Sequence, residues 1–153
     1  MILRSFTKFF GIPGMRLGCL LGAPDLVAQL AGEQEPWSVN TMAQLMGVAC
    51  LAEPDYINQT RTLIKTELEF LLARLAALPG LTTFPSVVNY LLVKLTRPGM
   101  TAAALRQQML VHRIVIRDAS NFRGLDERFF RIAVRGREEN ERLLAALEQC
   151  LRS

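Results

Sequence analysis

The sequence predicts a mixed fold, between α/β and α+β, in a chain of 153 residues that can bury one core of useful size. Three observations lead to this prediction. Proline-initiated helical patterns fill most of the first half, one long apolar periodicity predicts a helix over 54–78, and β-branched, alternating segments appear from residue 81 onward. A helix near 101–110 lies between these later strands, and a second helix near 137–151 follows them.

The first half opens on two short apolar segments, 2–3 and 17–21, which we expect to be buried strands. The loop between them is punctuated by glycine and proline. After this loop the pattern becomes helical, and it predicts helices over about 24–32 and 38–52. A sheet fragment followed by helices is therefore expected here.

The long central helix carries the clearest signal in the chain. Pro54 suits its first turn, and the charge of Asp55 is favourable near a helix amino terminus. Its apolar face recurs at helical spacing through Ile57, Ile64, Leu68, Leu71 and Leu75, until Pro79-Gly80 ends it. A helix of this length usually bridges parts of a fold, so the domain boundary is expected within or near it.

The second half predicts a small sheet covered on one side by helices. The expected strands span 81–84, 87–95, 114–116 and 129–134. The last helix is amphipathic, with its apolar side formed by Leu143, Leu144, Leu147 and Leu151.

Composition excludes several classes of protein. Half of the residues are apolar and 21% are charged, which is typical of a folded chain and not of a disordered one. The net charge of +4 comes from scattered basic residues, so we expect no nucleic-acid partner. No apolar window is long enough for a membrane span or an export signal. Cys19, Cys50 and Cys150 are odd in number and widely spaced, which indicates reduced thiols in a cytoplasmic protein and no metal site.

One short cluster near the start carries chemistry. Lys8 is preceded by the hydroxyl residues Ser5 and Thr7 and followed by a glycine-bearing loop that leads to Arg16. A phosphate-bearing aldehyde would suit this set, because the amine can react with the aldehyde while the hydroxyls and guanidinium bind the phosphate. The alternative is that the two cations are ordinary loop charges and the hydroxyls ordinary strand-end residues.

The segment "SFTKFFGIPGMRLGCLLG", residues 5–22, resembles the active-site segment of fold-type I pyridoxal-phosphate enzymes of the aspartate aminotransferase superfamily. The resemblance implies that Lys8 is the Schiff-base lysine and that Ser5, Thr7 and Arg16 are phosphate ligands of pyridoxal 5'-phosphate. It further implies that 1–53 is the end of a large cofactor-binding domain, 54–78 a connecting helix and 79–153 the small carboxy-terminal α+β domain.

The far end adds a second resemblance, to the small-domain terminus of the histidinol-phosphate aminotransferase branch. The segment "IVIRDASNFRGLDERFFRIAVRGREENERLLAAL", 114–147, is most similar to the threonine-phosphate decarboxylases of cobalamin biosynthesis. It implies that Arg131 binds the substrate carboxylate and that Arg117 helps to bind the anionic groups of the substrate. The ordinary alternatives are an ion pair of Arg131 with Asp126 or Glu127 and one of Arg117 with the adjacent aspartate.

Taken together, the resemblances imply the carboxy-terminal part of a pyridoxal-phosphate lyase that decarboxylates threonine phosphate. A homodimer is expected for the full-length enzyme. Such enzymes carry a long segment ahead of the lysine, so an amino-terminal large-domain segment is an expected partner, and activity of this chain alone is doubtful. Two alternatives stay open: a histidinol-phosphate-type aminotransferase, and a non-catalytic α+β interaction module.

Overall fold

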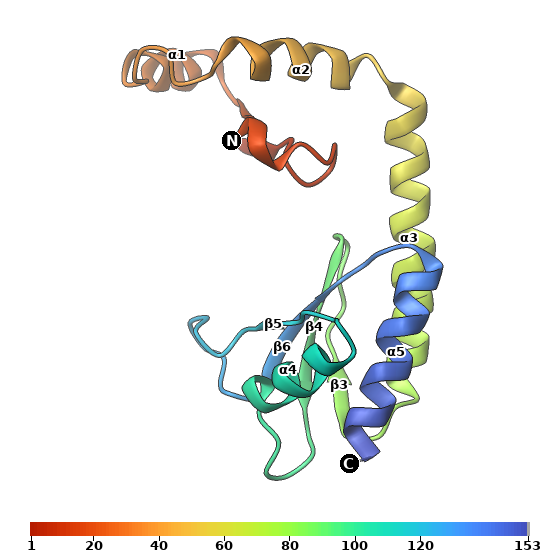
Figure 1. The fold of residues 1–153 in the computed structure, drawn as a ribbon. Coiled ribbons are helices and arrows are strands. Elements are labelled where there is room, and N and C mark those ends of the chain that lie inside the picture. The colour runs from red at the N-terminus through yellow and green to blue at the C-terminus, as the bar shows by residue number, and fades with distance from the viewer. Residues whose placement is uncertain (153) are drawn as a thin grey trace. The chain divides into compact units, whose positions relative to one another are not determined.

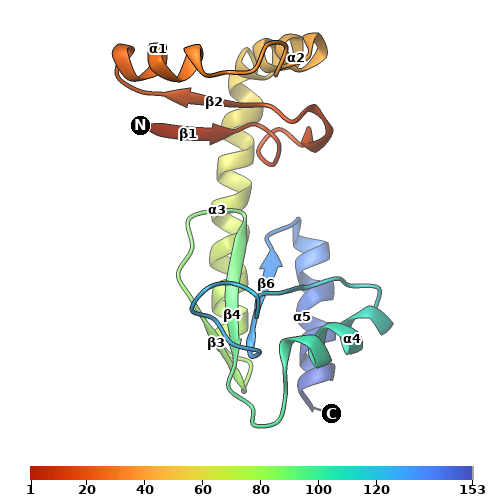
Figure 2. The ribbon, with the colours of Figure 1, turned by 90° about the vertical axis from the view of Figure 1, so that its left-hand side faces the viewer.

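The computed structural model describes residues 1–152, and these form two compact units, the first spanning Met1–Thr60 and the second beginning at Arg61. Figures 1 and 2 show the elements of each unit in two views. The boundary falls inside helix α3 (Pro54–Ala76). The division of the chain into 1–53, 54–78 and 79–153 stays a prediction.

Unit 1 consists of a two-stranded antiparallel sheet followed by helices. Strand β1 (Ile2–Ser5) pairs with β2 (Gly18–Leu21), and the loop between them contains the short helix η1 (Pro13–Met15). Helix α1 (Pro24–Gly32) begins with a proline at its first turn. Helix α2 (Thr41–Leu51) is capped by Asn40, whose side-chain oxygen accepts a hydrogen bond of 2.8 Å from the Ala43 amide.

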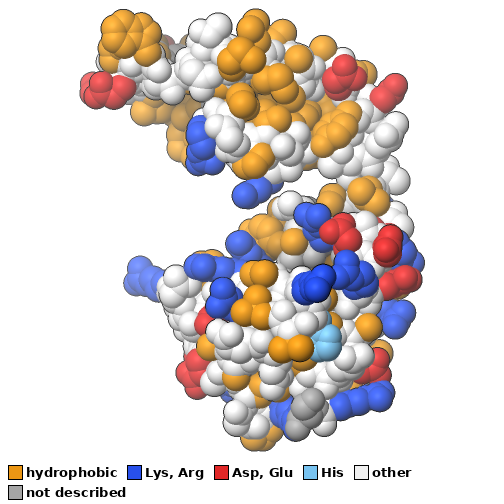
Figure 3. Space-filling view, in the orientation of Figure 1, with side chains coloured by type: hydrophobic (Ala, Val, Ile, Leu, Met, Phe, Trp, Pro, Cys, Tyr) orange, Lys and Arg blue, Asp and Glu red, His pale blue; other side chains and the backbone are white. Residues whose placement is uncertain are grey.

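The expectation that the first two strands are buried is wrong for this chain. All four residues of β1 are exposed, including Ile2 at 63% and Leu3 at 72%. The reason is that the sheet has only two strands in this chain, so neither face of β1 is enclosed. Apolar side chains of α2 are exposed as well, and Figure 3 shows such side chains spread over the surface of unit 1. A surface of this kind marks an interface.

Unit 2 is an antiparallel sheet in the order β3-β4-β6-β5 with helices packed against it. Its strands are β3 (Leu81–Thr83), β4 (Tyr90–Leu95), β5 (Arg117–Asp118) and β6 (Phe129–Ala133), and its helices are α4 (Ala102–Val111), α5 (Arg137–Arg152) and the second half of α3. The alternate residues of β4 and β6 that face the helices are fully or almost fully buried: Leu91, Val93, Leu95, Phe130 and Ile132. These residues form one core with the helices, as the alternation in the sequence predicts.

Two predicted strands have different bounds in the structure. The strand predicted over 87–95 begins at Tyr90, because the Ser86 hydroxyl accepts from the Val88 amide (3.2 Å) and donates to the Tyr90 carbonyl (2.7 Å), which holds a turn. The strand predicted over 114–116 is wrong, since pairing with β6 is confined to Arg117 and Asp118. The β-branched residues before it form no ladder.

A buried ionic contact joins α3 to α5. The carboxylate of Glu67 on α3, whose residue is only 4% exposed, accepts hydrogen bonds of 3.0 and 3.1 Å from Nε of Arg137 at the start of α5. The Arg137 guanidinium also lies 3.7 Å from the centre of the Phe70 ring. The Asn140 side chain also donates to Glu67, at 2.9 Å. The donors compensate for the desolvation of the buried charge.

Asn140 extends this contact to the sheet. Its Nδ2 donates to the Arg135 carbonyl at 2.8 Å and its Oδ1 accepts from the Arg135 amide at 3.0 Å. The turn that leaves β6 is therefore tied to α5 and, through Glu67, to α3. Among residues 1–152, no helix combines the length and apolarity needed to cross a bilayer.

We predict that Glu67→Ala lowers the free energy of unfolding of unit 2 by about 3 kcal/mol, the lower end of the range for breaking a buried pair, because the half-exposed Arg137 can turn to water. Glu67→Gln is the matched variant, because its amide oxygen still accepts from Asn140, and it should cost about 1 kcal/mol. Urea unfolding followed by circular dichroism measures both. Equal losses for the two variants would contradict an essential role for the acceptor.

We also predict that this contact makes unit 2 sensitive to acid. The Arg137 hydrogen bond holds the pKa of Glu67 below its ordinary value of 4.5. A lowered folded-state pKa gives stability that is fully present above the unfolded pKa and is lost as pH falls through the folded one. The free energy of unfolding should therefore fall more steeply below pH 4.5 in the native protein than in Glu67→Gln. Parallel pH profiles would show that the carboxylate has no such role.

Candidate functional site

The candidate residues of unit 1 gather where the β1–β2 hairpin opens into its loop. Ser5 is paired with Gly18, and the amide of Phe6 donates to the Leu17 carbonyl at 3.1 Å, so both ends of the loop are fixed. Beyond this point the Ser5 and Thr7 hydroxyl oxygens lie 2.8 Å apart, and the Thr7 amide donates to the Ser5 hydroxyl at 3.3 Å. The two hydroxyls predicted as ligands are thus brought together in one turn.

An aromatic cluster anchors the turn that carries Lys8. Phe6 is buried at 4% exposure and stacks on Phe10, with ring centres 5.4 Å apart. Phe9 and Phe10 both contact the Tyr56 ring, at 6.5 and 5.9 Å, and the Tyr56 hydroxyl donates to the Phe9 carbonyl at 3.2 Å. Tyr56 lies in the first turn of α3, so the helix holds the turn in place. The sequence motif alone did not identify Tyr56.

Lys8 is exposed between these anchored neighbours. Within residues 1–152 its ammonium group forms no ion pair and no hydrogen bond. An amine at a fixed backbone position, free of a carboxylate partner, is available to a carbonyl compound.

Arg16 ends the loop just before β2. Its backbone is left-handed at φ 53°, a conformation that costs a residue with a Cβ about 1 kcal/mol or more. Its guanidinium donates to the Pro13 carbonyl at 3.3 Å, and it enters none of the ion pairs found among the described residues. Hydroxyls, an amine and a guanidinium at one loop form a donor set suited to a phosphate that also bears a carbonyl group.

The candidate residues of unit 2 lie on the face of the sheet opposite the helices. Arg131 of β6 stands in register between Leu92 of β4 and Arg117 of β5. Its guanidinium lies 4.6 Å from the ring centre of Tyr90 and 6.0 Å from that of Phe122. The Arg117 guanidinium lies 5.8 Å from the same Phe122 ring and donates to the Asn121 side chain at 3.3 Å. Two cations therefore share one aromatic side chain.

Two of the acidic partners considered for these arginines, Asp126 and Asp118, are engaged elsewhere. Asp126 pairs with Arg128 at 2.5 Å, and these hydrogen bonds lower the pKa of Asp126 to about 2. The Asp118 carboxylate accepts from the Ser120 amide at 2.9 Å, which lowers the pKa of Asp118, with a smaller effect from the neighbouring Arg117. Neither Arg117 nor Arg131 joins an ion pair in the part of the chain that the structure describes.

Two cations directly opposite each other on paired strands repel, and the structure offers them no carboxylate. The arrangement is therefore suited to an anion, for which the planar guanidinium is a strong ligand. Sequence reasoning named both arginines but missed Tyr90 and Phe122, the aromatic rings that orient them. The only feature of the sequence that could have identified these two rings is their closeness in the chain to strand residues.

Comparison with known proteins places these features in context. A family model described as aminotransferase class I and II matches residues 1–147. A threonine-phosphate decarboxylase of Salmonella typhimurium is 40% identical over 151 residues, which are 98% of this chain and 41% of that protein. The chain thus spans about two fifths of the length of this curated relative.

Solved structures agree with this match. The histidinol-phosphate aminotransferase of Clostridium acetobutylicum gives a TM-score of 0.89 at 30% identity, over 98% of this chain and 45% of that one. The L-threonine-O-3-phosphate decarboxylase of Porphyromonas gingivalis gives a TM-score of 0.85 at 32% identity, over 99% of this chain and 46% of that one. The mixed α/β fold expected from the sequence is confirmed by these similarities.

We predict that Arg117→Gln raises the free energy of unfolding at low salt by up to about 1 kcal/mol, because it removes a like-charge cross-strand pair. Inorganic phosphate should stabilise the native protein and should stabilise this variant less. Thermal unfolding with and without phosphate measures both effects. Arg152→Gln is the control, because Arg152 pairs with Glu148 far along α5. An unchanged response of Arg117→Gln to phosphate would contradict the anion site.

Proposed function

The chain belongs to the aminotransferase class I and II family, and from this premise we propose that it is the carboxy-terminal part of a pyridoxal-phosphate enzyme acting on an amino-acid phosphate. The observation that carries the proposal is the loop of unit 1, where an unpaired amine follows two adjoining hydroxyls and precedes an exposed guanidinium. We further propose that the substrate is threonine phosphate and the reaction a decarboxylation, as named for two similar proteins.

The donor set fits pyridoxal phosphate. The Ser5 and Thr7 hydroxyls, 2.8 Å apart, can both donate to one phosphate group, and Arg16 can balance its charge. Lys8 would hold the aldehyde carbon through its amine nitrogen. When bound, the cofactor supplies an electron sink for the bond that breaks at the α-carbon of the substrate.

The residues of this chain then have separate tasks. Lys8 would carry a proton to or from the α-carbon of the substrate, because a free amine can act as a general base and, once protonated, as a general acid. Arg131 would hold the substrate carboxylate in a fixed direction, and Arg117 would contribute to binding a second anionic group. An amino-acid phosphate carries two such groups, which matches two arginines that have no carboxylate partner among the described residues.

The direction of the carboxylate decides the reaction. The bond at the α-carbon that stands perpendicular to the cofactor ring is the one that breaks, so a decarboxylase must hold the carboxylate there and an aminotransferase the hydrogen. A histidinol-phosphate-type aminotransferase is the second candidate, favoured by the similarity to the Clostridium acetobutylicum structure. It would need a keto acid acceptor and would release no carbon dioxide.

We propose two partners for the chain: an amino-terminal large-domain segment and, in the full-length enzyme, a second copy. The exposed apolar surface of unit 1 supports both, since residues such as Leu3, Trp37, Met42 and Val48 are more than half exposed. The full activity is expected only when these surfaces are covered.

The test of the cofactor assignment is reduction of the protein with borohydride after addition of pyridoxal phosphate. We expect a stable adduct at Lys8 when a separately expressed amino-terminal segment from the same genome is supplied, mapped by peptide mass spectrometry. Lys8→Ala should abolish it, whereas Lys65→Ala, the same change at an exposed lysine of α3, should not. Absence of an adduct at Lys8 with the segment present would overturn the proposal and favour a non-catalytic interaction module.

A further inference from the structure

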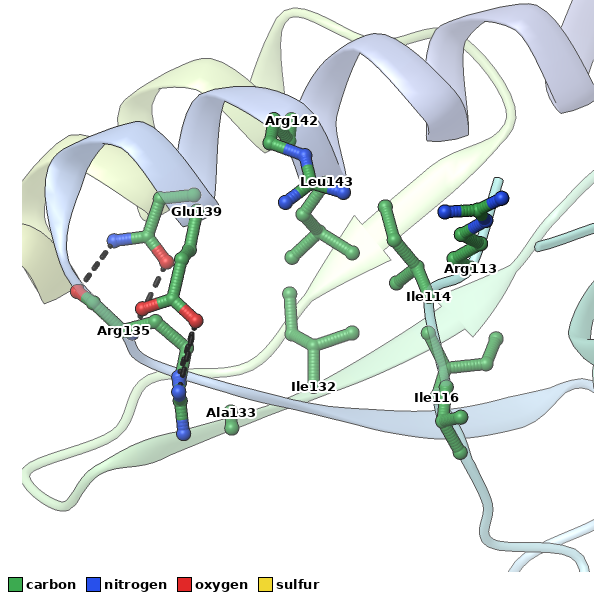
Figure 4. Close-up of a pocket in the computed structure, with 11 residues that line it drawn as sticks. Arg113, Ile114, Ile116, Ile132, Ala133, Arg135, Glu139, Arg142 and Leu143 are labelled. Carbon is green, nitrogen blue, oxygen red and sulfur yellow. Dashed lines mark hydrogen bonds and ion pairs between the residues drawn. The ribbon is translucent and has the colours of Figure 1, made fainter. Parts of the chain in front are cut away.

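Unit 2 contains a cavity whose lining includes none of the candidate site residues described above. It lies where the segment before β5 separates from β6, and it has a volume of about 320 Å³. Figure 4 shows its walls: Ile114 and Ile116 come from the separating segment, Ile132 from β6, and Leu143 from α5. The last paired residues of the two strands are Arg117 and Arg131. Continued pairing would have set Val115 opposite Ala133 and closed the gap.

The peptide groups of Ala133 face this gap. The Val134 amide donates to the Asn89 carbonyl on the β4 side, and the Phe129 carbonyl accepts from Ala119 on the other side. Since backbone groups alternate in direction along a strand, the N–H and C=O of Ala133 point away from β4, toward the cavity. Within residues 1–152 no hydrogen bond joins them to Val115. One donor and one acceptor of the sheet edge are therefore free.

The side chains around this edge combine apolar walls with positive charge. The side chains of Ile114, Ile132 and Leu143 converge on the cavity, which lies between α5 and the separating segment (Figure 4). Arg113 and Arg142 also line it, and neither guanidinium forms an ion pair or a hydrogen bond with a described residue. The third lining arginine, Arg135, is already paired with Glu139 at 2.8 Å.

The backbone at the rim is held in an unusual conformation. Arg113 adopts φ 58°, which is rare for a residue with a long side chain. Its amide donates to the Leu110 carbonyl at 2.9 Å, so the end of α4 fixes this geometry. A guanidinium is thereby kept beside the cavity in place of the glycine that such a turn favours.

We propose that this cavity binds a short extended peptide segment that carries a branched apolar side chain with carboxylates two residues to either side. The peptide adds to the β6 edge through the free N–H and C=O of Ala133, in the manner of β-strand addition. Its apolar side chain enters between Ile114, Ile132 and Leu143. Its carboxylates, which project on the same side as that apolar residue, meet Arg113 and Arg142.

The test uses the whole chain and the peptide Ac-Asp-Ala-Val-Ala-Asp-NH₂, followed by ¹H–¹⁵N NMR titration. Shifts should be centred on Ala133, Ile114 and Leu143. The peptide with both Asp replaced by Lys has the same backbone and apolar residue. It should bind at least about tenfold more weakly, since its lysines are repelled by the arginines of the cavity. Equal binding of the two peptides, or no shift at Ala133, would overturn the proposal.

Two variants separate the backbone from the charges. Ala133→Pro removes the N–H that faces the edge, at a position where proline is tolerated, and should abolish binding of the acidic peptide. Arg113→Gln combined with Arg142→Gln leaves the backbone intact and should weaken binding about tenfold, with Arg152→Gln as the unchanged control. Native-like binding in the double variant would contradict the site even if Ala133→Pro fails to fold.

Discussion

The buried carboxylate of Glu67 is the contact on which the geometry of unit 2 depends. It holds the first turn of α5 through Arg137 and, through Asn140, the backbone that leaves β6. Because β6 carries Arg131 four residues before that turn, the same contact limits how far the arginine strand can shift along its neighbours. A purely apolar contact between α3 and α5 would stabilise the core without fixing this register, since hydrophobic packing has no direction. The polar network thus links the stability of the unit to the placement of Arg131.

The two units are stabilised in different ways. Unit 2 has a continuous core and a sheet with one covered face, so its polar face is free to present arginines and aromatic rings. Unit 1 is held by a hairpin, helix caps and one aromatic cluster, and it leaves large apolar side chains exposed. Its lysine loop is nevertheless well fixed, because both ends of the loop are hydrogen bonded and its turn packs on Tyr56. The exposed Lys8 is thus held on a fixed turn in a unit that leaves large apolar side chains uncovered.

The helices and the core strands could be predicted from the sequence because their periodicities are strong and their faces are buried in this chain. Leu91, Val93 and Leu95 alternate as expected, and α3 begins at Pro54 as predicted. The failures have local physical causes. Ile114–Ile116 has strand-like residues but pairs with no other strand among the described residues. The strand predicted from residue 87 begins instead at Tyr90, because the hydrogen bonds of Ser86 hold a turn there. The motif residues Ser5, Thr7, Lys8 and Arg16 were singled out by the resemblance of a short segment to a family motif. Tyr56, Tyr90 and Phe122 depend on contacts that no short motif encodes.

We propose that Arg131 directs the carboxylate of an amino-acid phosphate whose α-carbon bond is broken with the help of Lys8. The most direct measurement follows threonine phosphate labelled with ¹³C in its carboxyl group, in the protein completed by its amino-terminal segment. The account predicts that the label leaves as carbon dioxide, and that Arg131→Gln suppresses this release more than it suppresses the borohydride-fixed adduct at Lys8. Retention of the label in a keto acid would contradict decarboxylation and indicate an aminotransferase. Carbon dioxide release that is unchanged in Arg131→Gln would contradict the role given to the arginine.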